Sequence, residues 1–106
     1  MVRRGEVWLV ILDPTVGSEI QKTRPCVIVS PAEMHDLRTV IVVPMTTGSK
    51  PAPFRIPLDF DGKKGLILTE QIRVVDKTRL TKRLGEVNPK VLASTLAILQ
   101  EIFTGA

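Results

Sequence analysis

The residues of this sequence best suited to chemistry are one arginine and two consecutive threonines. A polar loop at residues 17–25 ends in Thr-Arg-Pro and places Arg24 where an apolar run begins, while Thr46 and Thr47 directly follow another apolar run. A guanidinium stays charged and can bind two nonbridging phosphate oxygens at once, and a threonine hydroxyl can donate a hydrogen bond to the same phosphate. The combination predicts a site that handles phosphate.

Cleavage of an RNA phosphodiester suits these groups, because the ribose 2′-OH supplies the nucleophile. The protein must then orient that hydroxyl in line, stabilise charge on the phosphoryl oxygens and move protons. Arg24 would stabilise the charge, Thr46 would donate a hydrogen bond, and Thr47 could replace it. Glu19, in the same loop as Arg24, is the candidate proton acceptor, although the two could instead form an ion pair that only orders the loop.

Other kinds of active site lack their residues in this sequence. A metal-dependent nuclease needs clustered carboxylates or histidines, but the acids are scattered and His35 is the single histidine. The sequence Gly-Lys-Lys-Gly at 62–65 lacks the spacing of a phosphate-binding P-loop, and no serine triad can be assembled. We therefore expect metal-free chemistry without a cofactor.

The charge balance favours an acidic partner. The chain has 15 Lys and Arg against 11 Asp and Glu, a net charge of +4 and a pI near 9.6, which would attract nucleic acid or an acidic protein segment. Single-stranded RNA would need a basic track, for which Lys50 and Lys77 are the preferred candidates. The full set of candidates is Lys22, Lys50, Arg55, Arg73, Lys77, Arg79, Lys82 and Arg83.

Composition also predicts the compartment. Cys26 is the single cysteine and lies in an apolar run, so a packed thiol in a reducing compartment is expected. The longest apolar run, at residues 7–12, is far shorter than the roughly 20 residues of a membrane span, and the amino terminus has no signal-peptide pattern. We expect a cytoplasmic protein that does not bind membranes.

The first half of the chain reads as three buried strands. Apolar runs at 6–12, 26–30 and 39–45 are typical of strands that are covered on both faces. Between the last two, Ser30 is expected to cap a short helical turn, with Glu33 completing a capping box.

The second half reads as shorter strands and one helix. Pro57 marks residues 54–59 as an edge strand, residues 61–65 form a turn, strands follow at 66–69 and 71–75, and a weaker strand spans 80–87. A helix should begin after Asn88 and end at Gly105, with apolar residues at helical spacing (Leu92, Leu96, Leu99, Phe103) packed on the sheet. Residues 1–106 are therefore expected to form one mainly β (α+β) domain, a small SH3-like barrel of antiparallel strands with a C-terminal helix.

Several segments together resemble one family. They are Arg-Gly-Glu-Val-Trp-Leu-Val at 4–10, Asp-Pro-Thr at 13–15, Gly-Ser-Glu with Thr-Arg-Pro, Val-Pro-Met-Thr-Thr, and Glu-Gln-Ile-Arg at 70–73. In order, spacing and chain length they are similar to the MazF/PemK (Kid) toxins over nearly the whole chain. The resemblance implies the CcdB/PemK-like toxin fold and a homodimeric, sequence-specific, ribosome-independent endoribonuclease of a type II toxin-antitoxin system.

The resemblance also implies roles for single residues. By motif, Arg24 and Thr46 match the catalytic pair of the family, and Ser18 of Gly-Ser-Glu joins Lys22, Thr47, Lys50, Gln71 and Lys77 as RNA-binding candidates. One branch of the family places an arginine beside an acid near the later Asp/Glu-Gln element. Here Glu70 is preceded by Leu68 and Thr69, so an acid or base role for Glu70 does not carry over directly, and Gln71 could read a base edge, brace a loop or serve as a strand amide.

The resemblance further implies partners and products. An antitoxin with an acidic, flexible tail would occupy the basic groove, and the pair would bind its own operator DNA. RNA cleavage would leave a 5′-OH and a 2′,3′-cyclic phosphate or 3′-phosphate. Two alternatives remain open on the residues: a CcdB-like toxin that inhibits gyrase by contact, and a noncatalytic basic interaction domain.

Overall fold

The computed structural model describes residues 1–105, in which seven strands precede one α-helix. The strands are β1 (Glu6–Ile11), β2 (Thr23–Ile28), β3 (Thr39–Thr46), β4 (Arg55–Phe60), β5 (Lys63–Leu68), β6 (Arg73–Asp76) and β7 (Leu80–Glu86). Short 3-10 helices η1 (Ala32–Met34), η2 (Thr69–Gln71) and η3 (Lys77–Arg79) connect some of them, and α1 (Pro89–Thr104) follows. No helix among these residues is long and apolar enough to cross a membrane.

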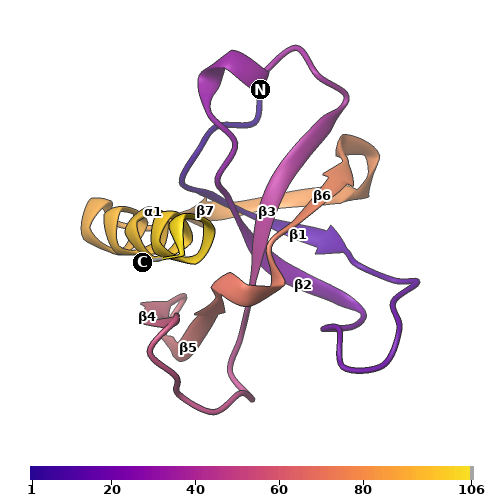
Figure 1. Ribbon diagram of the computed structural model, residues 1–106. Helices are drawn as coiled ribbons and strands as arrows, with labels where there is room; N and C mark the ends of the chain where they lie inside the picture. The colour runs from indigo at the N-terminus through magenta and orange to yellow at the C-terminus, as the bar shows by residue number, and fades with distance from the viewer. Residues whose placement is uncertain (106) are drawn as a thin grey trace.

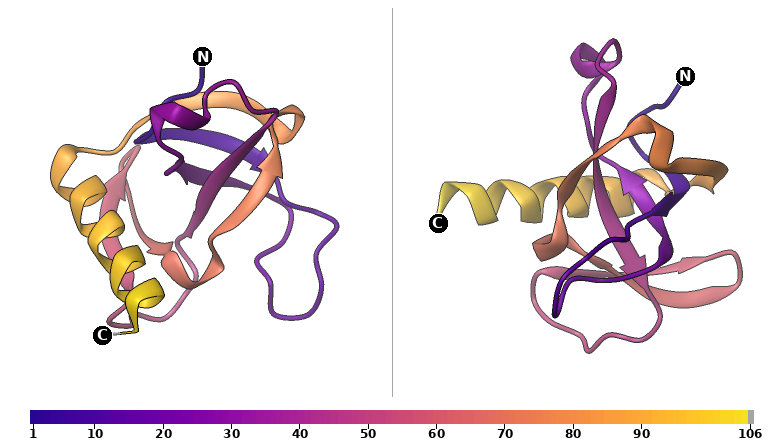
Figure 2. Two further views of the ribbon diagram at one scale, coloured as in Figure 1. Left: turned by 45° about the horizontal axis from the view of Figure 1, so that its top comes forward. Right: turned by 90° about the vertical axis from the view of Figure 1, so that its right-hand side faces the viewer.

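The strands form one curled antiparallel sheet. Its order is β4-β5-β3-β2-β1-β7, and β6 pairs with β3 beside this path. The sheet bends into a half-barrel, and α1 lies along one side of it against β4 and η2 (Figures 1 and 2). The predicted antiparallel barrel with a C-terminal helix is confirmed.

Two apolar clusters cover the two faces of the central strands. The helix-side core contains Val7, Val27, Val29, Val43, Met45, Ile56, Ile67, Val87 and Leu99, with Leu92 and Leu96 of α1 packed on it. The loop-side core contains Val10, Leu12, Cys26, Ile28, Val40, Val42 and Val75, with Ile20 packed on it. Continuous apolar runs in β1 to β3 are thereby explained, because successive side chains enter opposite cores.

The hairpin of β4 and β5 differs from the expected five-residue turn. Only Asp61 and Gly62 form the turn, with φ of 52° and 77°, and β5 already begins at Lys63. Positive φ at both central residues matches the twist of a two-residue hairpin, for which Asp-Gly is a favoured sequence. The expected edge strand is confirmed, since β4 pairs only with β5 and lies at the end of the sheet.

The predicted strands at 66–69 and 71–75 are wrong in their bounds. Residues 69–71 form η2 instead, and β6 is the short strand after it. Thr69 is fully buried, whereas Val74 is 58% exposed, so Val74 does not point into a core. The sheet therefore breaks at η2, close to the segments that follow β1 and β3.

The capping box predicted at Ser30 is also wrong. Pro31 is the N-cap residue of η1 and no side chain caps this helix. Ser30 is buried and its Oγ accepts a hydrogen bond from the Ile41 N–H at 2.8 Å. A tertiary contact to the neighbouring strand has replaced the local one.

The terminal helix follows the prediction at both ends. Asn88 Oδ1 accepts from the Val91 N–H at 2.8 Å, and Gly105 ends the helix with φ of 67°. The exception is Phe103, which is 70% exposed, because the last turn of α1 extends away from the sheet (Figure 2, right).

Candidate active site

The site lies where two central strands separate. β2 and β3 pair only from Ile28↔Val42 to Cys26↔Pro44; beyond that point β2 stays with β1 and β3 continues with β5. The Val29 N–H of the same segment donates to the Ile41 carbonyl, so Pro25, four residues earlier, also faces β3 but lacks the N–H that would extend the ladder to Met45. The separation opens a cavity of about 260 Å³, here called the apolar cavity.

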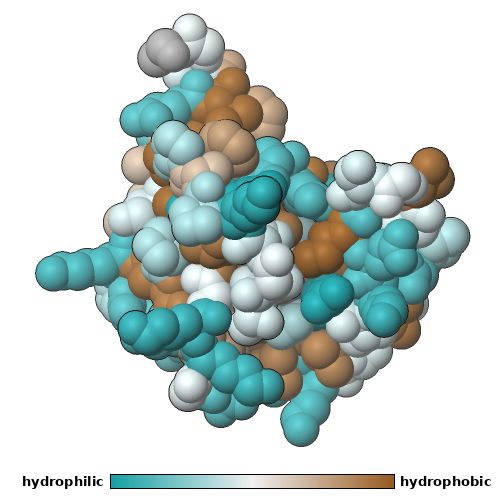
Figure 3. Space-filling view, turned by 90° about the horizontal axis from the view of Figure 1, so that it is seen from below, coloured by the Kyte–Doolittle hydropathy of each residue, from teal (hydrophilic) through white to brown (hydrophobic). Residues whose placement is uncertain are grey.

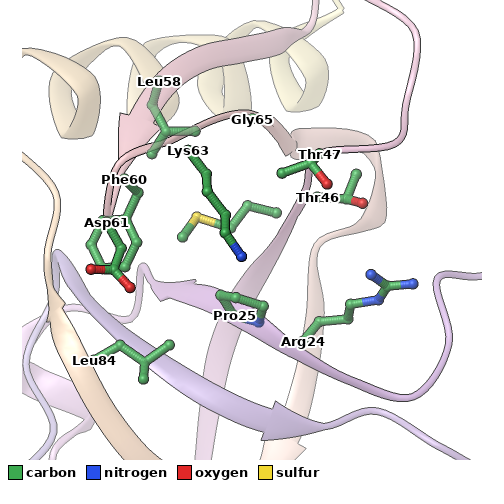
Figure 4. A pocket seen from close by; sticks show the side chains of 11 residues that line it. Arg24, Pro25, Thr46, Thr47, Leu58, Phe60, Asp61, Lys63, Gly65 and Leu84 are labelled. Carbon is green, nitrogen blue, oxygen red and sulfur yellow. The ribbon is translucent and has the colours of Figure 1, made fainter.

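The apolar cavity has a hydrophobic floor and a polar rim. Its floor comes from Pro25, Met45, Leu58, Phe60 and Leu84, and its rim from Arg24, Thr46, Thr47, Asp61, Lys63 and Gly65. The ammonium of Lys63 extends into the middle of the cavity, whereas the Arg24 guanidinium points outward at the rim, on the side of Thr46 (Figure 4). Seen from below, apolar surface shows in small areas among hydrophilic side chains (Figure 3).

Strand alternation places Arg24 and Thr46 on the same face of the sheet. Arg24 is paired with Val10 and lies two residues before Cys26, and both of these belong to the loop-side core. Thr46 lies two residues after Pro44, the partner of Cys26. Because side chains two residues apart on a strand share a face, Arg24 and Thr46 both lie on the loop-side face, and both line the apolar cavity where the strands separate.

The guanidinium of Arg24 is oriented by one hydrogen bond, and its other donors are available for a ligand. Its Nε donates to the Gln21 carbonyl at 3.1 Å, and among residues 1–105 its two terminal nitrogens have no hydrogen-bond partner. Arg24 is the second residue of β2 and not the last of a loop, since β2 begins three residues earlier than expected. A strand residue is held more rigidly than a loop residue, which favours a fixed charge.

The hydroxyl of Thr46 also keeps a free donor. Its Oγ1 accepts from the Gly48 N–H at 3.3 Å, which leaves the hydroxyl hydrogen available for a ligand. Gly65 of β5 lies against this residue, so closely that a Cβ there would be 3.0 Å from the Thr46 carbonyl oxygen. Thr47, exposed at the rim, is the next residue of the loop 47–54, here called the threonine loop.

A second cavity holds the other polar candidates. This loop cavity of about 540 Å³ is lined by Ser18, Glu19 and Gln71, together with Val16, Ile20, Glu70, Ile72 and Arg73. Glu19 Oε1 accepts from the Val16 N–H at 2.7 Å within residues 12–22, here called the arginine loop. In the described chain Glu19 forms no ion pair with Arg24, so the predicted loop-ordering pair is wrong.

Some of the basic candidates are exposed near the site, and others lie elsewhere or bind backbone carbonyls. Lys22 and Lys50 are exposed near the site, and Lys22 has a positive φ of 70°. Lys77 is not brought to the site: it follows Asp76, the partner of Thr39, so the length of β3, about 23 Å, separates it from Thr46. Its Nζ donates to the His35 carbonyl at 2.7 Å.

Most of the other predicted track residues support the fold. Arg73 donates to the Leu12 carbonyl, Arg79 to the Ile11 and Asp13 carbonyls, Arg83 to Glu6, and Arg55 to Glu70. Lys82 is exposed on β7. The expected continuous track is therefore reduced to a few lysines close to Arg24.

Sequence reasoning missed Lys63 at the rim of the apolar cavity, and it missed Phe60 and the rest of the hydrophobic floor. The signal was present, because Asp61-Gly62 is the hairpin sequence that makes Phe60 and Lys63 a cross-strand pair. Arg24 and Lys63 against Asp61 give the apolar cavity a net positive charge. An anion is therefore favoured here over a cation.

The thiol beneath the site is inert. Burial raises the pKa of Cys26 to about 12, although the nearby Arg73 charge opposes this. The thiol is neutral at physiological pH and offers no nucleophile. Among residues 1–105, no three His, Cys, Asp or Glu side chains are grouped to hold a metal ion.

Comparisons with known proteins give a consistent picture. A family model described as PemK-like, MazF-like toxin of type II toxin-antitoxin system matches residues 3–103. Endoribonuclease PemK of Escherichia coli is 41% identical over 110 aligned residues, which cover 97% of this chain and 83% of that protein. Endoribonuclease MazF9 of Mycobacterium tuberculosis is 37% identical, and the alignment covers 88% of each chain.

Solved structures have the same fold. MazF from Deinococcus radiodurans aligns with a TM-score of 0.86 at 26% identity, over 99% of this chain and 97% of that one. A mycobacterial endoribonuclease in complex with its cognate antitoxin aligns with a TM-score of 0.82 over 98% of this chain and 96% of its own; its identity of 22% shows the fold alone.

Proposed function

This chain belongs to the PemK-like, MazF-like toxins of type II toxin-antitoxin systems, and on that premise we propose that it is a sequence-specific, ribosome-independent endoribonuclease that cuts single-stranded RNA without a metal ion. The supporting relatives are named endoribonucleases and align over most of their lengths. The observation that carries the proposal is the position of Arg24 and Thr46. They share one sheet face where β2 and β3 separate, and each keeps a free donor.

The proposed reaction uses the ribose 2′-OH as nucleophile. Its oxygen attacks phosphorus and forms the P–O2′ bond, the P–O5′ bond breaks, and a 2′,3′-cyclic phosphate and a 5′-OH remain. One proton leaves the 2′-OH and one is delivered to the 5′ oxygen. Arg24 stabilises the charge on the nonbridging oxygens, and the Thr46 hydroxyl donates to the same group.

Glu19 is the proposed proton acceptor. Its loop covers the sheet face on which Arg24 emerges, because Ile20 of that loop packs on the loop-side core. The Val16 N–H holds one carboxylate oxygen and leaves the other for a proton. Glu19→Gln should lower kcat strongly with little change in KM, and a wild-type kcat in this variant would reject this role.

Both cavities are proposed to accommodate RNA. A base beside the scissile phosphate would enter the apolar cavity, with Thr47 and Lys63 at its rim, while Ser18 and Gln71 face RNA in the loop cavity. Lys22 and Lys50 would contact neighbouring phosphates. Sequence selection would then depend on the shape and hydrogen bonds of the two loops.

The proposed partners follow from family membership and charge. An antitoxin with an acidic tail would cover the positively charged site, and its affinity should fall as salt rises. A homodimer is the proposed unit, and the toxin-antitoxin complex is proposed to bind operator DNA. The cytoplasm is the proposed compartment.

Cleavage of a fluorescent RNA in EDTA tests the activity. Arg24→Ala and Thr46→Val should each lower the rate by about two to three orders of magnitude, since each removes a donor to the developing charge. Lys90→Ala is the matched control: it removes one positive charge at an exposed position on α1 and should cleave normally. Circular dichroism confirms that each variant is folded.

Three results would reject the proposal. Equal cleavage by wild type and Arg24→Ala would remove Arg24 from the reaction. Intact RNA together with inhibited DNA supercoiling would favour a CcdB-like gyrase inhibitor, and intact RNA with normal supercoiling would favour a noncatalytic interaction domain.

A further inference from the structure

Three consecutive side chains of η2 reach the two loops that flank the site. Thr69 and Glu70 contact the end of the threonine loop and Arg55 just after it, while Gln71 contacts the arginine loop. These loops begin or end beside Thr46 and Arg24. η2 itself lies in the break of the sheet between β5 and β6 (Figure 1).

The contact with the threonine loop is a chain of hydrogen bonds through Arg55. Its Nη2 and Nε donate to Glu70 Oε2 at 2.5 and 3.1 Å, and its Nη1 donates to the Lys50 carbonyl at 2.9 Å. The Thr69 hydroxyl donates to the Phe54 carbonyl. The middle and the end of this loop, which starts beside Thr46, are therefore connected to η2.

The contact with the arginine loop is a single direct bond. Gln71 Oε1 accepts from the Ile20 N–H at 2.7 Å, across 51 residues of sequence. The loop is closed at its base by the Leu12 N–H, which donates to the Lys22 carbonyl at 2.9 Å. Gln71 therefore fixes the returning arm of this loop at Ile20, four residues before Arg24.

The ion pair of Arg55 and Glu70 is not explained by stability alone. The side chains of Arg55 and Glu70 are 21% and 31% exposed, and ion pairs in such surroundings add little to the free energy of unfolding. Arg55 holds one carboxylate oxygen of Glu70 with two donors, which fixes both side chains in one geometry. Positioning of the loops accounts for the arrangement better.

We propose that η2 is a clasp in which Glu70, acting through Arg55, and Gln71, acting through Ile20, hold the two RNA-facing loops in their binding positions. These are positioning residues and do not touch the reacting atoms. The inference rests on the proposed endoribonuclease function and deepens it. In this proposal Thr69, Glu70 and Gln71 set the distance between the two loops, and this distance determines which RNA segment fits between them.

A double-mutant cycle in the RNA cleavage assay tests the clasp. Glu70→Ala and Arg55→Ala should each lower kcat/KM about tenfold, mainly through KM, because loop positions change while Arg24 and Thr46 stay in place. The double variant should be no worse than either single one, since both break the same contact. The acidic limb of the pH profile should keep its position in Glu70→Ala.

Other results would overturn it. A loss of kcat in Glu70→Ala, together with wild-type kinetics in Arg55→Ala, would show that Glu70 acts without Arg55. A loss of kcat/KM of about a hundredfold in the double variant would show that the two residues act independently. Wild-type kinetics in both single variants would also reject the clasp.

Amide hydrogen exchange separates this inference from the activity itself. Gln71→Ala should speed exchange of the Ile20 N–H about tenfold or more, whereas Gln71→Glu keeps an acceptor oxygen and should retain slow exchange. Unchanged exchange in Gln71→Ala would contradict the clasp even if RNA is cut. If wild type fails to cut RNA, the proposed function fails, and the exchange result still decides whether η2 holds the loop.

Discussion

Replacing Gly65 by alanine tests how closely β5 must approach the threonine of the site. A Cβ at this position would lie 3.0 Å from the Thr46 carbonyl oxygen and 3.9 Å from Thr47 Cγ2. A displacement of about 0.4 Å restores an ordinary contact of 3.4 Å. Because the obstructing atom is backbone and Thr46 is paired with Leu66 of β5, the displacement must move the strand that carries Thr46.

The expected loss of activity follows from that displacement. A misplacement of about 1 Å can lower a rate about a hundredfold, so 0.4 Å gives roughly a sixfold loss if the barrier rises in proportion. We expect this loss in kcat, measured by steady-state cleavage of fluorescent RNA well below the melting temperature. Overpacking should also lower the free energy of unfolding by about 1–3 kcal/mol.

A matched glycine provides the control. A Cβ on Gly48 would be 3.9 Å from Thr46 Oγ1, an ordinary contact, and Gly48 has no positive φ. Gly48→Ala should therefore cleave at nearly the wild-type rate. Wild-type kcat in Gly65→Ala, or equal losses in the two variants, would refute the argument that close strand approach positions Thr46.

Three further predictions concern the rest of the molecule. Burial raises the pKa of Glu6, but hydrogen bonds from the Arg3 N–H, Arg83 and Trp8 outweigh it and hold the pKa below its ordinary 4.5. The free energy of unfolding should therefore fall as pH drops below about 5. Urea titrations should show a weaker fall in Glu6→Gln. Cys26 should resist iodoacetamide at about pH 8 in the folded protein and react in guanidinium, as mass spectrometry can show, because its pKa is raised to about 12. Asn88→Ala should lose about 1 kcal/mol and lower Tm by about 4–8 °C in thermal denaturation, since the cap of α1 is removed.

The parts of the fold that sequence predicts well are those with strong local or repeating signals. The apolar runs of β1 and β3 required two covered faces, and the structure supplies two cores. Asn88 and Gly105 marked the ends of α1 because capping needs only neighbouring residues. The same apolar runs predicted that Arg24 lies near the start of β2 and Thr46 at the end of β3.

The failures arose where distant contacts decide the local structure. Ser30 pairs with Ile41 rather than capping η1, and residues 69–71 leave the sheet because their side chains bind loops far away in sequence. Lys77 was expected near RNA, but the antiparallel pairing of β6 with β3 carries it to the opposite end. No local pattern contains this information.

The site itself depends on an interruption in the sheet. A continuous ladder would satisfy the backbone of β2 and β3 and leave no space beside Arg24 and Thr46. Pro25 faces β3 but cannot donate to such a ladder; beyond Cys26↔Pro44, β2 remains with β1 while β3 passes to β5, and the gap between them becomes the apolar cavity. Pro25 therefore does more than precede an apolar run: it lies at the point where the sheet opens, with the Arg24 cation and the Thr46 hydroxyl at the rim of the opening.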